Sequence, residues 1–582
     1  MRVTARPGGV SVHPPSAEMA PLRTMLRVWL PPGSVTSAGR RLDVTLAAAE
    51  LLLEPGTVPG VDFEWDEDAR LCVTNRARAR AVWPVMRRLQ ERLTAEAGDL
   101  ARVLLSDGRD LETLDEHQLV DVALMTAPEG VGACIFDEQG TGKTAVVVYA
   151  FDVLASRGLV DQLLVVAPKS MVPEWRSDFA KFMGDLYRVE VLVGGRAAGR
   201  RLDVGADVLV TNYETAVANE PALTALAKSA GGRLALVVDE SHNVKNPDAA
   251  RSRALARLRN RCERAFVLCG TPAPNAPHDV VHQFDLVDFG ATFEGVQIPQ
   301  DRAQARAVIQ SAMAARGIYT RNLKSHVMPD LPGKRFTRVL VPLELVQREA
   351  YEAALAGLIR DLSGADDQTF ARDLASYLAR KSALLQICSN PGAVVPGYAE
   401  TPAKLLALDL LLDRLVNQEG EKVVVWSFYR HSLDALCTRY ARLGLVRYDG
   451  TVTSIEARRE AVRRFQEDPD VRIFVGNPAA AGAGLTLHAA RMAVFESLSN
   501  QTAHFLQSVD RIHRRGQTRE VELLALLCDE SIETIEFDRL QGKARSQREL
   551  LGDDDEEALT RETFLGELLI AQALLGERGK VP

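Results

Sequence analysis

"ACIFDEQGTGKT", residues 133–144, joins a short apolar run to a glycine-rich turn. The apolar residues 133–136 predict a strand, and residues 140–144 predict a turn that opens a helix. A phosphate-binding loop requires this order of strand, turn and helix. The first glycine of the G-x-x-x-x-G-K-[ST] pattern is missing, because Asp137 stands in its place. The stretch therefore predicts an α/β fold but leaves open whether the turn binds a nucleotide.

The residues of this turn have the chemistry that ATP requires. The backbone amides of the turn are suited to bind a β-phosphate at a helix N-terminus. Lys143 is the candidate for neutralising phosphate oxygens, and the Thr144 hydroxyl is the candidate Mg²⁺ ligand. A glycine turn before an ordinary helix remains the alternative. The candidate ATP-binding residues of the turn are Asp137, Gly140, Thr141, Gly142, Lys143 and Thr144.

A second element about a hundred residues downstream favours the nucleotide interpretation. The run 234–241, "LALVVDES", places Asp239 and Glu240 at the end of an apolar strand. Ligand groups of open α/β sheets lie at the carboxyl ends of strands. We expect Asp239 to hold Mg²⁺ together with Thr144, and Glu240 to polarise the attacking water. An exposed acidic strand end is the alternative, but the order of the two elements predicts an ATP site.

Two series of apolar runs predict two α/β lobes, each a parallel sheet with flanking helices. The first series lies at 161–168, 206–213, 234–241 and 264–272, and the second at 421–428, 445–450, 471–477, 492–498 and 521–527. The intervening pattern is helical. We therefore predict the following division: an N-terminal accessory α+β region at 1–109, an α/β lobe at 110–284, helical insertions at 285–400, a second α/β lobe at 401–545 and a helical tail at 546–582.

The accessory region carries two local predictions. "VDFEWDEDARLCVTN", residues 61–75, predicts a hairpin that turns at residues 66–68. "RAVWPVMRRLQERLT", residues 80–94, predicts an amphipathic helix. A purely structural hairpin is the favoured interpretation, and a small substrate-binding module is the alternative.

Composition indicates a globular protein of a reducing cytoplasm. The chain has 582 residues, 46% of them hydrophobic and 25% charged. No apolar run approaches the roughly 18 residues that span a bilayer, and the N-terminus lacks an apolar signal region. The seven cysteines form no C-x-x-C pair, which argues against a zinc ribbon or a disulfide framework. The net charge of −8 is not that of a protein that coats DNA, although a locally basic groove is compatible with it.

The motifs together resemble the Swi/Snf-type branch of superfamily-two helicase-like ATPases, in the form of a bacterial or phage member. The resemblance implies that the lobes at 110–284 and 401–545 are tandem RecA-like lobes. That branch carries an acidic DE-x-G-x-GKT loop, so the resemblance accounts for Asp137. "LDEHQ", residues 114–118, is similar to the adenine-reading motif, with Gln118 as the reader. "DESH" and "LCGTP" (268–272) are similar to the motifs that couple hydrolysis to movement. They imply coupling roles for His242, Gly270 and Thr271.

The second lobe continues the resemblance. "QSVDRIHRRGQT", residues 507–518, is similar to motif six of the family. It implies that Arg511 and Arg514 are arginine fingers directed at the γ-phosphate. Gln507 is then a further ATP-site residue, and Asp510 is a further coupling residue that organises the fingers.

Motors of this kind are expected to hold the nucleic-acid backbone through phosphate contacts that do not depend on sequence. The candidates lie in the segments that resemble the strand-tracking motifs. They are Lys169, Ser170, Thr211, Asn212, Lys245 and Asn246 in the first lobe, and Gly450, Gly484 and Thr486 in the second. Lys169 and Lys245 are equally compatible with ordinary surface lysines.

The resemblance implies a DNA-dependent ATPase that translocates along duplex DNA, with ATP and Mg²⁺ as cofactors. It is nearest in appearance to the annealing and fork-remodelling relatives, so forked or branched DNA is a candidate substrate. The alternatives are a strand-separating replication helicase of a phage or plasmid, a polymerase-recycling motor, or the motor subunit of a defence or restriction assembly. A module that only senses ATP is disfavoured, because Glu240 and both arginines are present. A protein partner would act through residues 1–109 or the tail, and no membrane is involved.

Overall fold

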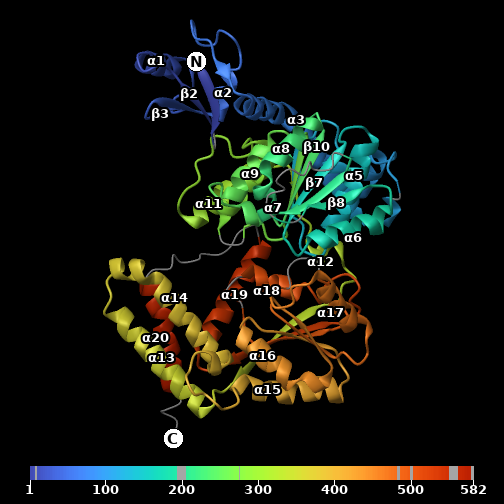
Figure 1. Cartoon of the computed structure of the whole chain (residues 1–582), viewed down its shortest axis with the longest axis vertical. Coiled ribbons are helices and arrows are strands. Elements are labelled where there is room, and N and C mark those ends of the chain that lie inside the picture. Colours follow the sequence, from blue (N-terminus) through green and yellow to red (C-terminus); the bar gives the residue numbers. More distant parts are fainter. Residues whose placement is uncertain are drawn as a thin grey trace. The chain divides into compact units, whose positions relative to one another are not determined.

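The computed structural model shows two compact units, residues 1–327 and 328–582 (Figure 1). Each unit is built around its own parallel sheet, as the sequence predicts. The structure describes residues 1–6, 9–109, 111–192, 194, 205–231, 233–273, 276–480, 485–498, 502–549 and 561–577.

The first unit contains a seven-stranded, fully parallel sheet in the order β12-β6-β11-β10-β7-β9-β8. Its central strands are buried at every position, which matches their continuous apolar sequences. The strands are β6 (Gly132–Ile135), β7 (Gln162–Ala167), β8 (Val189–Leu192), β9 (Val208–Asn212), β10 (Leu234–Asp239), β11 (Arg264–Leu268) and β12 (Tyr319–Thr320).

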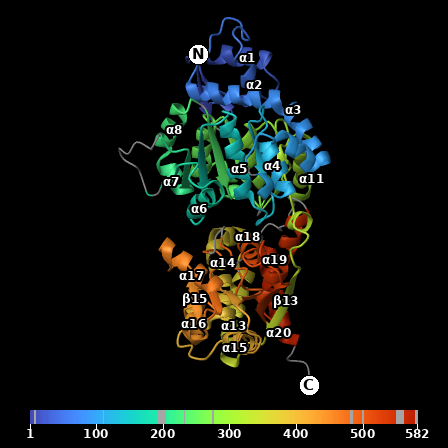
Figure 2. The ribbon, with the colours of Figure 1, turned by 90° about the vertical axis from the view of Figure 1, so that its right-hand side faces the viewer.

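Helices cover both faces of this sheet (Figure 2). They connect successive parallel strands, so the carboxyl ends of those strands meet at one edge of the sheet. The helices are α4 (Glu116–Met125), α5 (Lys143–Ser156), α6 (Val172–Met183), α7 (Tyr213–Ala218), α8 (Glu220–Ser229), α9 (Ala250–Arg259), α10 (Val281–Asp288), α11 (Arg302–Arg316) and α12 (Lys324–Val327).

The N-terminal region is an α+β structure with its own hydrophobic core. Its five-stranded sheet has the order β3-β4-β2-β1-β5, and every pair is antiparallel except β1 with β5. The elements are β1 (Arg2–Arg6), β2 (Gly9–His13), α1 (Met19–Trp29), β3 (Val35–Ala38), β4 (Arg41–Thr45), α2 (Leu46–Leu51), β5 (Glu64–Trp65) and α3 (Glu67–Leu104).

The hairpin predicted at 61–75 is wrong. A two-residue strand, β5, ends at Trp65, and α3 begins at Glu67. Asp66 caps this helix, because its carboxylate accepts a hydrogen bond of 2.7 Å from the Ala69 amide. Glu67 and Asp68 of the predicted turn instead lie in the first turn of a helix, where the positive end of the helix dipole favours acidic side chains. The helix predicted at 80–94 is confirmed as part of α3.

Helix α3 connects the N-terminal region to the first lobe. It contains Pro84 and has a break at Ala97, where φ is 43°. Arg76 is almost fully buried on it and contacts both Glu50 (3.0 Å) and Glu294 (2.8 Å). The Arg76 guanidinium also donates to the Phe289 carbonyl at 2.7 Å. One side chain thus ties the accessory region to the lobe within the first unit.

The second unit contains a six-stranded parallel sheet in the order β13-β18-β17-β14-β16-β15. Val423 and Val425 of β14 belong to one hydrophobic core, and Val424 and Trp426 belong to another. Alternate residues of a strand point to opposite faces, so the sheet is buried on both sides. The strands are β13 (Lys334–Val341), β14 (Val423–Trp426), β15 (Leu445–Tyr448), β16 (Ile473–Gly476), β17 (Met492–Phe495) and β18 (Val521–Cys528).

The helices of the second unit include a packed group outside the sheet. Aromatic contacts join Phe370 to Tyr377 and to Phe564 at centroid distances of 5.7 and 6.0 Å. This group comprises α13 (Leu345–Ser363), α14 (Asp367–Ser389), α19 (Ile532–Glu549) and α20 (Arg561–Glu577). The other helices are α15 (Ala403–Leu412), α16 (Arg430–Arg439), α17 (Ile455–Glu467) and α18 (Thr502–Val509).

All predicted strands of both lobes are present, but three strands were not predicted. Strands β8 and β12 form the edges of the first sheet, and β13 forms an edge of the second. Strand β13 alternates between half-buried and exposed residues, and its sequence "KRFTRVLV" has no continuous apolar run. The segment predicted as helical insertions divides between the units, with α11 in the first and α13 and α14 in the second.

A buried ion pair stabilises the second unit. Lys404, fully buried on α15, donates to the Glu533 carboxylate at 2.7 Å and to the Glu496 carbonyl at 2.7 Å. The Glu496 carboxylate accepts hydrogen bonds from Ser389 and Ser427 at 2.6 and 2.7 Å. The network links helices of the unit to the end of β17.

We expect Lys404→Met to destabilise the full chain by about 3–5 kcal/mol, because Glu533 would be left as a buried charge without its cation. Urea unfolding followed by circular dichroism measures this change. Arg463→Met is the matched control, because Arg463 pairs with Glu460 on an exposed helix face. That control should cost less than about 1 kcal/mol. Equal losses in the two variants would contradict the importance of the buried pair.

Candidate active site

The glycine-rich turn has the backbone geometry of a phosphate-binding loop. Gly140 and Gly142 have φ angles of 86° and 95°, and α5 begins at Lys143 directly after Gly142. A β-carbon at Gly142 would lie 2.1 Å from the side-chain nitrogen of Gln118. Glycine is therefore required at this position by both conformation and space.

Lys143 is positioned over its own loop. Its ammonium donates to the carbonyl oxygens of Asp137 (2.7 Å) and Glu138 (3.2 Å). The Thr141 hydroxyl closes the loop by donating to the Glu138 carbonyl at 2.8 Å. Thr144 follows in the first turn of α5 and is partly exposed. The ammonium and the helix N-terminus together offer positive potential to an anion.

Gln118 is in direct contact with the phosphate-loop turn. Its amide oxygen accepts from the Asp115 amide at 2.9 Å, and its amide nitrogen donates to the Thr141 carbonyl at 2.8 Å. His117 contacts the same carbonyl at 3.1 Å. Gln118 therefore connects the start of α4 to the loop, and its adenine-reading role stays a prediction.

Asp137 attaches the loop to residues 320–322, near the end of the first unit. Its carboxylate is 1% exposed and accepts from the backbone amide of Asn322 at 3.0 Å. Both carboxylate oxygens also accept from the Asn322 side chain, at 3.1 and 3.0 Å. The Thr320 hydroxyl adds a contact at 3.2 Å. Burial and the Asp137 carboxylate raise the pKa of the neighbouring Asp121 well above its ordinary value. A carboxylate here thus has a structural reason that a glycine would not satisfy.

We expect Asn322→Ala to destabilise the full chain by about 2–3 kcal/mol, because the buried Asp137 carboxylate would lose the side-chain donor to both oxygens. Urea unfolding measures the change. Thr320→Val is the control, since it removes one neutral hydroxyl from the same carboxylate and should cost about 1 kcal/mol. A smaller effect for Asn322→Ala than for Thr320→Val would contradict this role.

Asp239 and Glu240 lie at the carboxyl end of β10, as predicted. Asp239 accepts hydrogen bonds from the Trp175 indole at 3.0 Å and from the Glu240 amide at 2.9 Å. The Tyr213 hydroxyl donates to the Asp239 carbonyl at 2.5 Å. Burial, and then the adjacent Glu240 carboxylate, raise the pKa of Asp239 to about 6. A cation at this carboxylate would relieve the cost of its burial.

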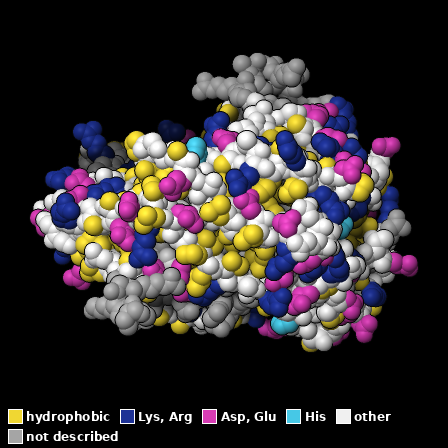
Figure 3. Space-filling model, turned by 90° about the horizontal axis from the view of Figure 1, so that it is seen from below, with side chains coloured by type: hydrophobic (Ala, Val, Ile, Leu, Met, Phe, Trp, Pro, Cys, Tyr) yellow, Lys and Arg dark blue, Asp and Glu magenta, His cyan; other side chains and the backbone are white. Residues whose placement is uncertain are grey.

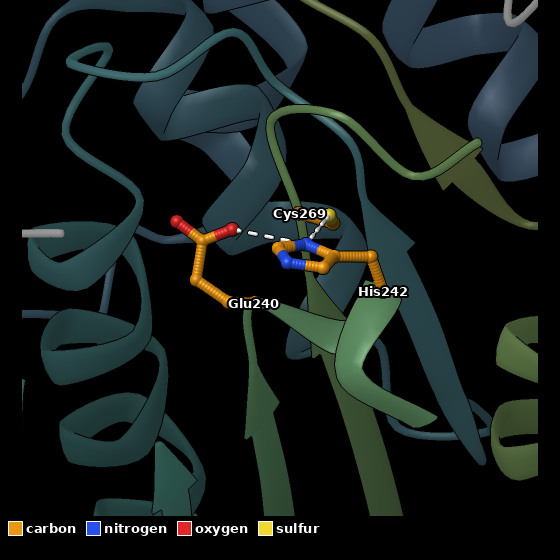
Figure 4. Close-up of side chains that lie close together, drawn as sticks. All are labelled: Glu240, His242 and Cys269. Carbon is orange, nitrogen blue, oxygen red and sulfur yellow. Dashed lines mark hydrogen bonds and ion pairs between the residues drawn. The ribbon is translucent and has the colours of Figure 1, made fainter. Parts of the chain in front are cut away.

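Glu240 has a left-handed backbone, with φ and ψ of 52° and 54°. Such a conformation is unfavourable for glutamate and is found preferentially at functional sites. The Gln139 side chain donates to one carboxylate oxygen at 3.1 Å. The other oxygen lies 3.4 Å from Nδ1 of His242 (Figure 4). The strand end therefore holds this carboxylate in a defined orientation.

His242 connects the acidic pair to the next strand. Its Nδ1 also lies 3.3 Å from the Cys269 sulfur, which follows the end of β11. Burial alone would lower the pKa of His242, but Cys269 and Glu240 raise it to about 10. The imidazole is thus favoured as a cation between these two groups. The next residue, Gly270, packs against Gln139, where a β-carbon would lie 2.5 Å from the Gln139 side chain.

Because the folded-state pKa of Asp239 is raised, its contribution to stability is most favourable below about pH 4 and declines as the pH rises through 6. We therefore expect Asp239→Asn to stabilise the nucleotide-free chain at pH 8 by about 3 kcal/mol, and by about half as much at pH 5. Urea unfolding at the two pH values measures the difference. Asp185→Asn, at an exposed position, should change stability little at either pH. A stabilisation of Asp239→Asn that is independent of pH would contradict the raised pKa.

Motif six, residues 507–518, contacts residues 485–486 within the second unit. The Arg511 guanidinium, 4% exposed, donates to the Leu485 carbonyl at 3.4 Å. Arg514 donates to the Thr486 hydroxyl at 2.8 Å and to the Leu485 carbonyl at 3.4 Å. Gln507 and Asp510 are buried on or next to α18. The unit thus brings all four predicted residues of motif six together, while their contact with a γ-phosphate stays a prediction.

The predicted nucleic-acid contacts differ in their exposure and in their local partners. Lys169 and Ser170 follow β7 at the carboxyl edge of the sheet, and Lys169 is exposed. Asn246 is also exposed, and Gly450 is exposed in the second unit. Lys245 forms an ion pair with Asp279 at 2.9 Å. Gly484 lies outside the described residues.

Two of these residues have local structural roles. The Thr211 side chain is fully buried on β9, and its hydroxyl donates to the Leu192 carbonyl at 3.0 Å. Asn212 is 7% exposed and caps α7, because its amide oxygen accepts from the Thr215 amide at 2.8 Å. Each residue thus uses a side-chain oxygen in a local hydrogen bond, and its contact with DNA stays a prediction.

Several residues of the site were not singled out by sequence reasoning. Trp175 and Tyr213 support the acidic pair, Gln139 orients Glu240, and Asn322 holds Asp137. Gln139 lies within the glycine-rich stretch 133–144 and Tyr213 ends a predicted apolar run, whereas Trp175 and Asn322 lie outside the predicted motifs. Their roles depend on contacts between distant segments, which spacing along the chain does not show.

The surface carries both signs of charge. The face seen in Figure 3 shows basic, acidic and hydrophobic side chains interspersed. Among the described residues, no helix is long and apolar enough to cross a membrane.

Comparisons with known proteins agree with the motifs. A family profile of the SNF2-related domain matches residues 84–393, and one of the helicase conserved C-terminal domain matches residues 404–516. The DNA annealing helicase and endonuclease ZRANB3 of Mus musculus is 28% identical over 442 residues, which are 71% of this chain and 38% of that protein. A probable chromatin-remodeling complex ATPase chain of Oryza sativa subsp. japonica is 27% identical, over 78% of this chain and 42% of that protein. The chain therefore spans about two fifths of the length of these relatives.

Among solved structures, the SWI2/SNF2 ATPase core of Sulfolobus solfataricus in complex with dsDNA is similar to this chain. The sequence identity is 20% and the TM-score is 0.35, over 80% of this chain and 96% of that chain.

Proposed function

Since this chain belongs to the SNF2-related family of helicase-like ATPases, we propose that it is a cytoplasmic, ATP-dependent translocase of double-stranded DNA. The observation that carries the proposal is the juxtaposition, at one edge of the first sheet, of the Lys143 loop with the buried pair Asp239 and Glu240. This pair supplies a cation ligand and a water-polarising carboxylate beside a phosphate-binding turn.

The residues present fit ATP with Mg²⁺. Mg²⁺ prefers oxygen ligands, and the Thr144 hydroxyl and the Asp239 carboxylate would hold it. When bound, the ion would neutralise charge on the β- and γ-phosphates. Lys143 would exchange its loop carbonyls for phosphate oxygens. Glu240, oriented by Gln139, would accept a hydrogen bond from the attacking water.

The second unit would complete the reaction. Arg511 and Arg514 are the proposed fingers that neutralise charge on the transferring phosphoryl group, an effect of about 10³–10⁵ in rate where such fingers have been measured. Arg511 contacts Leu485 and Arg514 contacts Thr486. The position of these arginines is therefore linked to the proposed DNA contact at Thr486 within one unit. Such a link is one route by which hydrolysis could change the hold on DNA.

Coupling in the first unit would run through His242. It contacts Glu240 and Cys269, and Gly270 follows Cys269 directly. A change in the Glu240 carboxylate during hydrolysis would therefore reach the LCGTP segment, residues 268–272. Alternate closing and opening of the two units on ATP would then move the duplex without reading its sequence.

The relatives support DNA as the partner and suggest which DNA. Several are named as annealing helicases, and others as chromatin-remodeling ATPases. Forked or partly annealed duplexes are therefore the proposed substrates, with phosphate contacts at Lys169, Ser170 and Asn246. A protein partner would be recruited through residues 1–109 or the tail.

The test is ATP hydrolysis by the full chain with no nucleic acid, duplex DNA, single-stranded DNA, forked DNA or RNA. We expect duplex or forked DNA to stimulate hydrolysis most strongly. Lys143→Ala and Glu240→Gln should each lower the stimulated rate by about 10²-fold or more. The surface variant Lys228→Ala is the matched lysine control, because Lys228 pairs with Glu67 on an exposed surface.

Displacement of a third strand from a triplex separates translocation from strand separation. A translocase displaces the third strand when ATP is present but leaves a plain duplex intact. Unwinding of the plain duplex would favour a strand-separating helicase instead. Hydrolysis that no nucleic acid stimulates would overturn the proposal of an autonomous DNA motor.

A further inference from the structure

Three side chains of different chemistry converge beside the acidic pair. Nδ1 of His242 lies 3.3 Å from the Cys269 sulfur and 3.4 Å from a carboxylate oxygen of Glu240. The three ligand atoms all lie within 4.8 Å of one another. In Figure 4, Nδ1 of His242 lies between the Glu240 carboxylate and the Cys269 sulfur and contacts both.

The fold fixes this convergence. Strands β10 and β11 are parallel neighbours, with Asp239 opposite Leu268. Glu240 and Cys269 are the next residues of these strands and therefore emerge side by side at the carboxyl edge. His242 comes from the short 3₁₀ turn Ser241–Val244 that follows β10. No long loop is needed to assemble the three groups.

We propose that Glu240, His242 and Cys269 form a binding site for Zn²⁺ or another borderline-soft divalent cation. A tetrahedral zinc centre with Zn–S of about 2.3 Å and Zn–N of about 2.0 Å separates its ligand atoms by roughly 3.5 Å. The observed spacings of 3.3 and 3.4 Å match that requirement. Three protein ligands leave a fourth position for water, and sulfur with nitrogen selects against Mg²⁺.

The second cluster of metal-ligating groups, Cys388, Cys528 and Glu533, is a poorer site. The Glu533 carboxylate already accepts from the Lys404 ammonium at 2.7 Å and from the Cys528 amide at 2.8 Å. A cation there would meet the charge of Lys404, which is not a ligand, whereas at the first cluster the ion would displace the proton of its own ligand His242. All three residues of the second cluster are at most 4% exposed. At the first cluster the His242 side chain is 19% exposed, which gives an ion a way in.

The site makes zinc an inhibitor, a consequence that rests on the proposed function. Glu240 is the carboxylate proposed to polarise water, and coordination would withdraw it. His242, the proposed link to the LCGTP segment, would be immobilised at the same time. The proposed Mg²⁺ ligands, Thr144 and Asp239, are not among the zinc ligands. Zinc would therefore stop hydrolysis without competing for the magnesium position.

The direct test is titration of the full chain with Co²⁺, without nucleotide or DNA, followed by thiolate-to-cobalt absorption in the near ultraviolet. We expect one equivalent to give this band and Zn²⁺ to displace it. Cys269→Ser should lose the band, whereas Cys262→Ser and Cys388→Ser should keep it. His242→Asn keeps the thiol and should weaken Co²⁺ binding at least tenfold. If circular dichroism shows that Cys269→Ser does not fold, the Co²⁺ affinity of His242→Asn decides whether the site exists. A band that is absent from the wild type or unchanged in Cys269→Ser and His242→Asn would overturn the site.

The second arm measures ATP hydrolysis in increasing Zn²⁺, with each variant compared with its own zinc-free rate. The zinc concentration for half-inhibition should rise at least tenfold in Cys269→Ser but not in Cys388→Ser. Equal inhibition of both would overturn zinc regulation through this site. If the chain hydrolyses no ATP under any condition, the proposed function fails while the cobalt spectrum still decides the metal site.

Discussion

Parallel strands that are buried on both faces leave polar groups no place except the ends of the strands. In the first unit, β10 and β11 are buried along their whole lengths, and their carboxyl ends carry Asp239, Glu240 and Cys269. The phosphate loop follows the end of β6, and Lys169 follows β7. The site is therefore a consequence of the sheet, because helical crossovers bring these strand ends to one edge.

The same edge carries an electrostatic cost. Burial raises the pKa of both Asp121 and Asp239, and no cation fully relieves either carboxyl group in the structure. The left-handed backbone of Glu240 adds conformational strain. These costs are offset by neutral donors, since Trp175 donates to Asp239 and Asn322 donates to Asp121. The arrangement is ready for a cation and an anionic ligand, whose arrival would lower the free energy of groups already in position.

The sequence predicted the parts of the structure that repeat a strong local pattern. The buried strands read as continuous apolar runs, and the loop and the acidic pair follow motifs with a defined backbone geometry. The edge strand β13 escaped prediction because it is only half buried, so its residues show no apolar run. The hairpin at 61–75 failed because acidic residues favour both turns and helix N-termini. Thr211 and Asn212 were assigned to DNA by motif position, while contacts from neighbouring strands and helices use their polar groups.

Helix α3 changes what the N-terminal region is. The buried Arg76 on this helix contacts both Glu50 and Glu294, so the accessory region is attached directly to the first lobe. The predicted boundary at residue 109 therefore separates two segments that pack against each other. A chain shortened to begin there would lose a packed face of its motor lobe along with its accessory sheet. Its behaviour would report on folding of the lobe as much as on recruitment, so single substitutions on the accessory sheet are the cleaner way to separate the two.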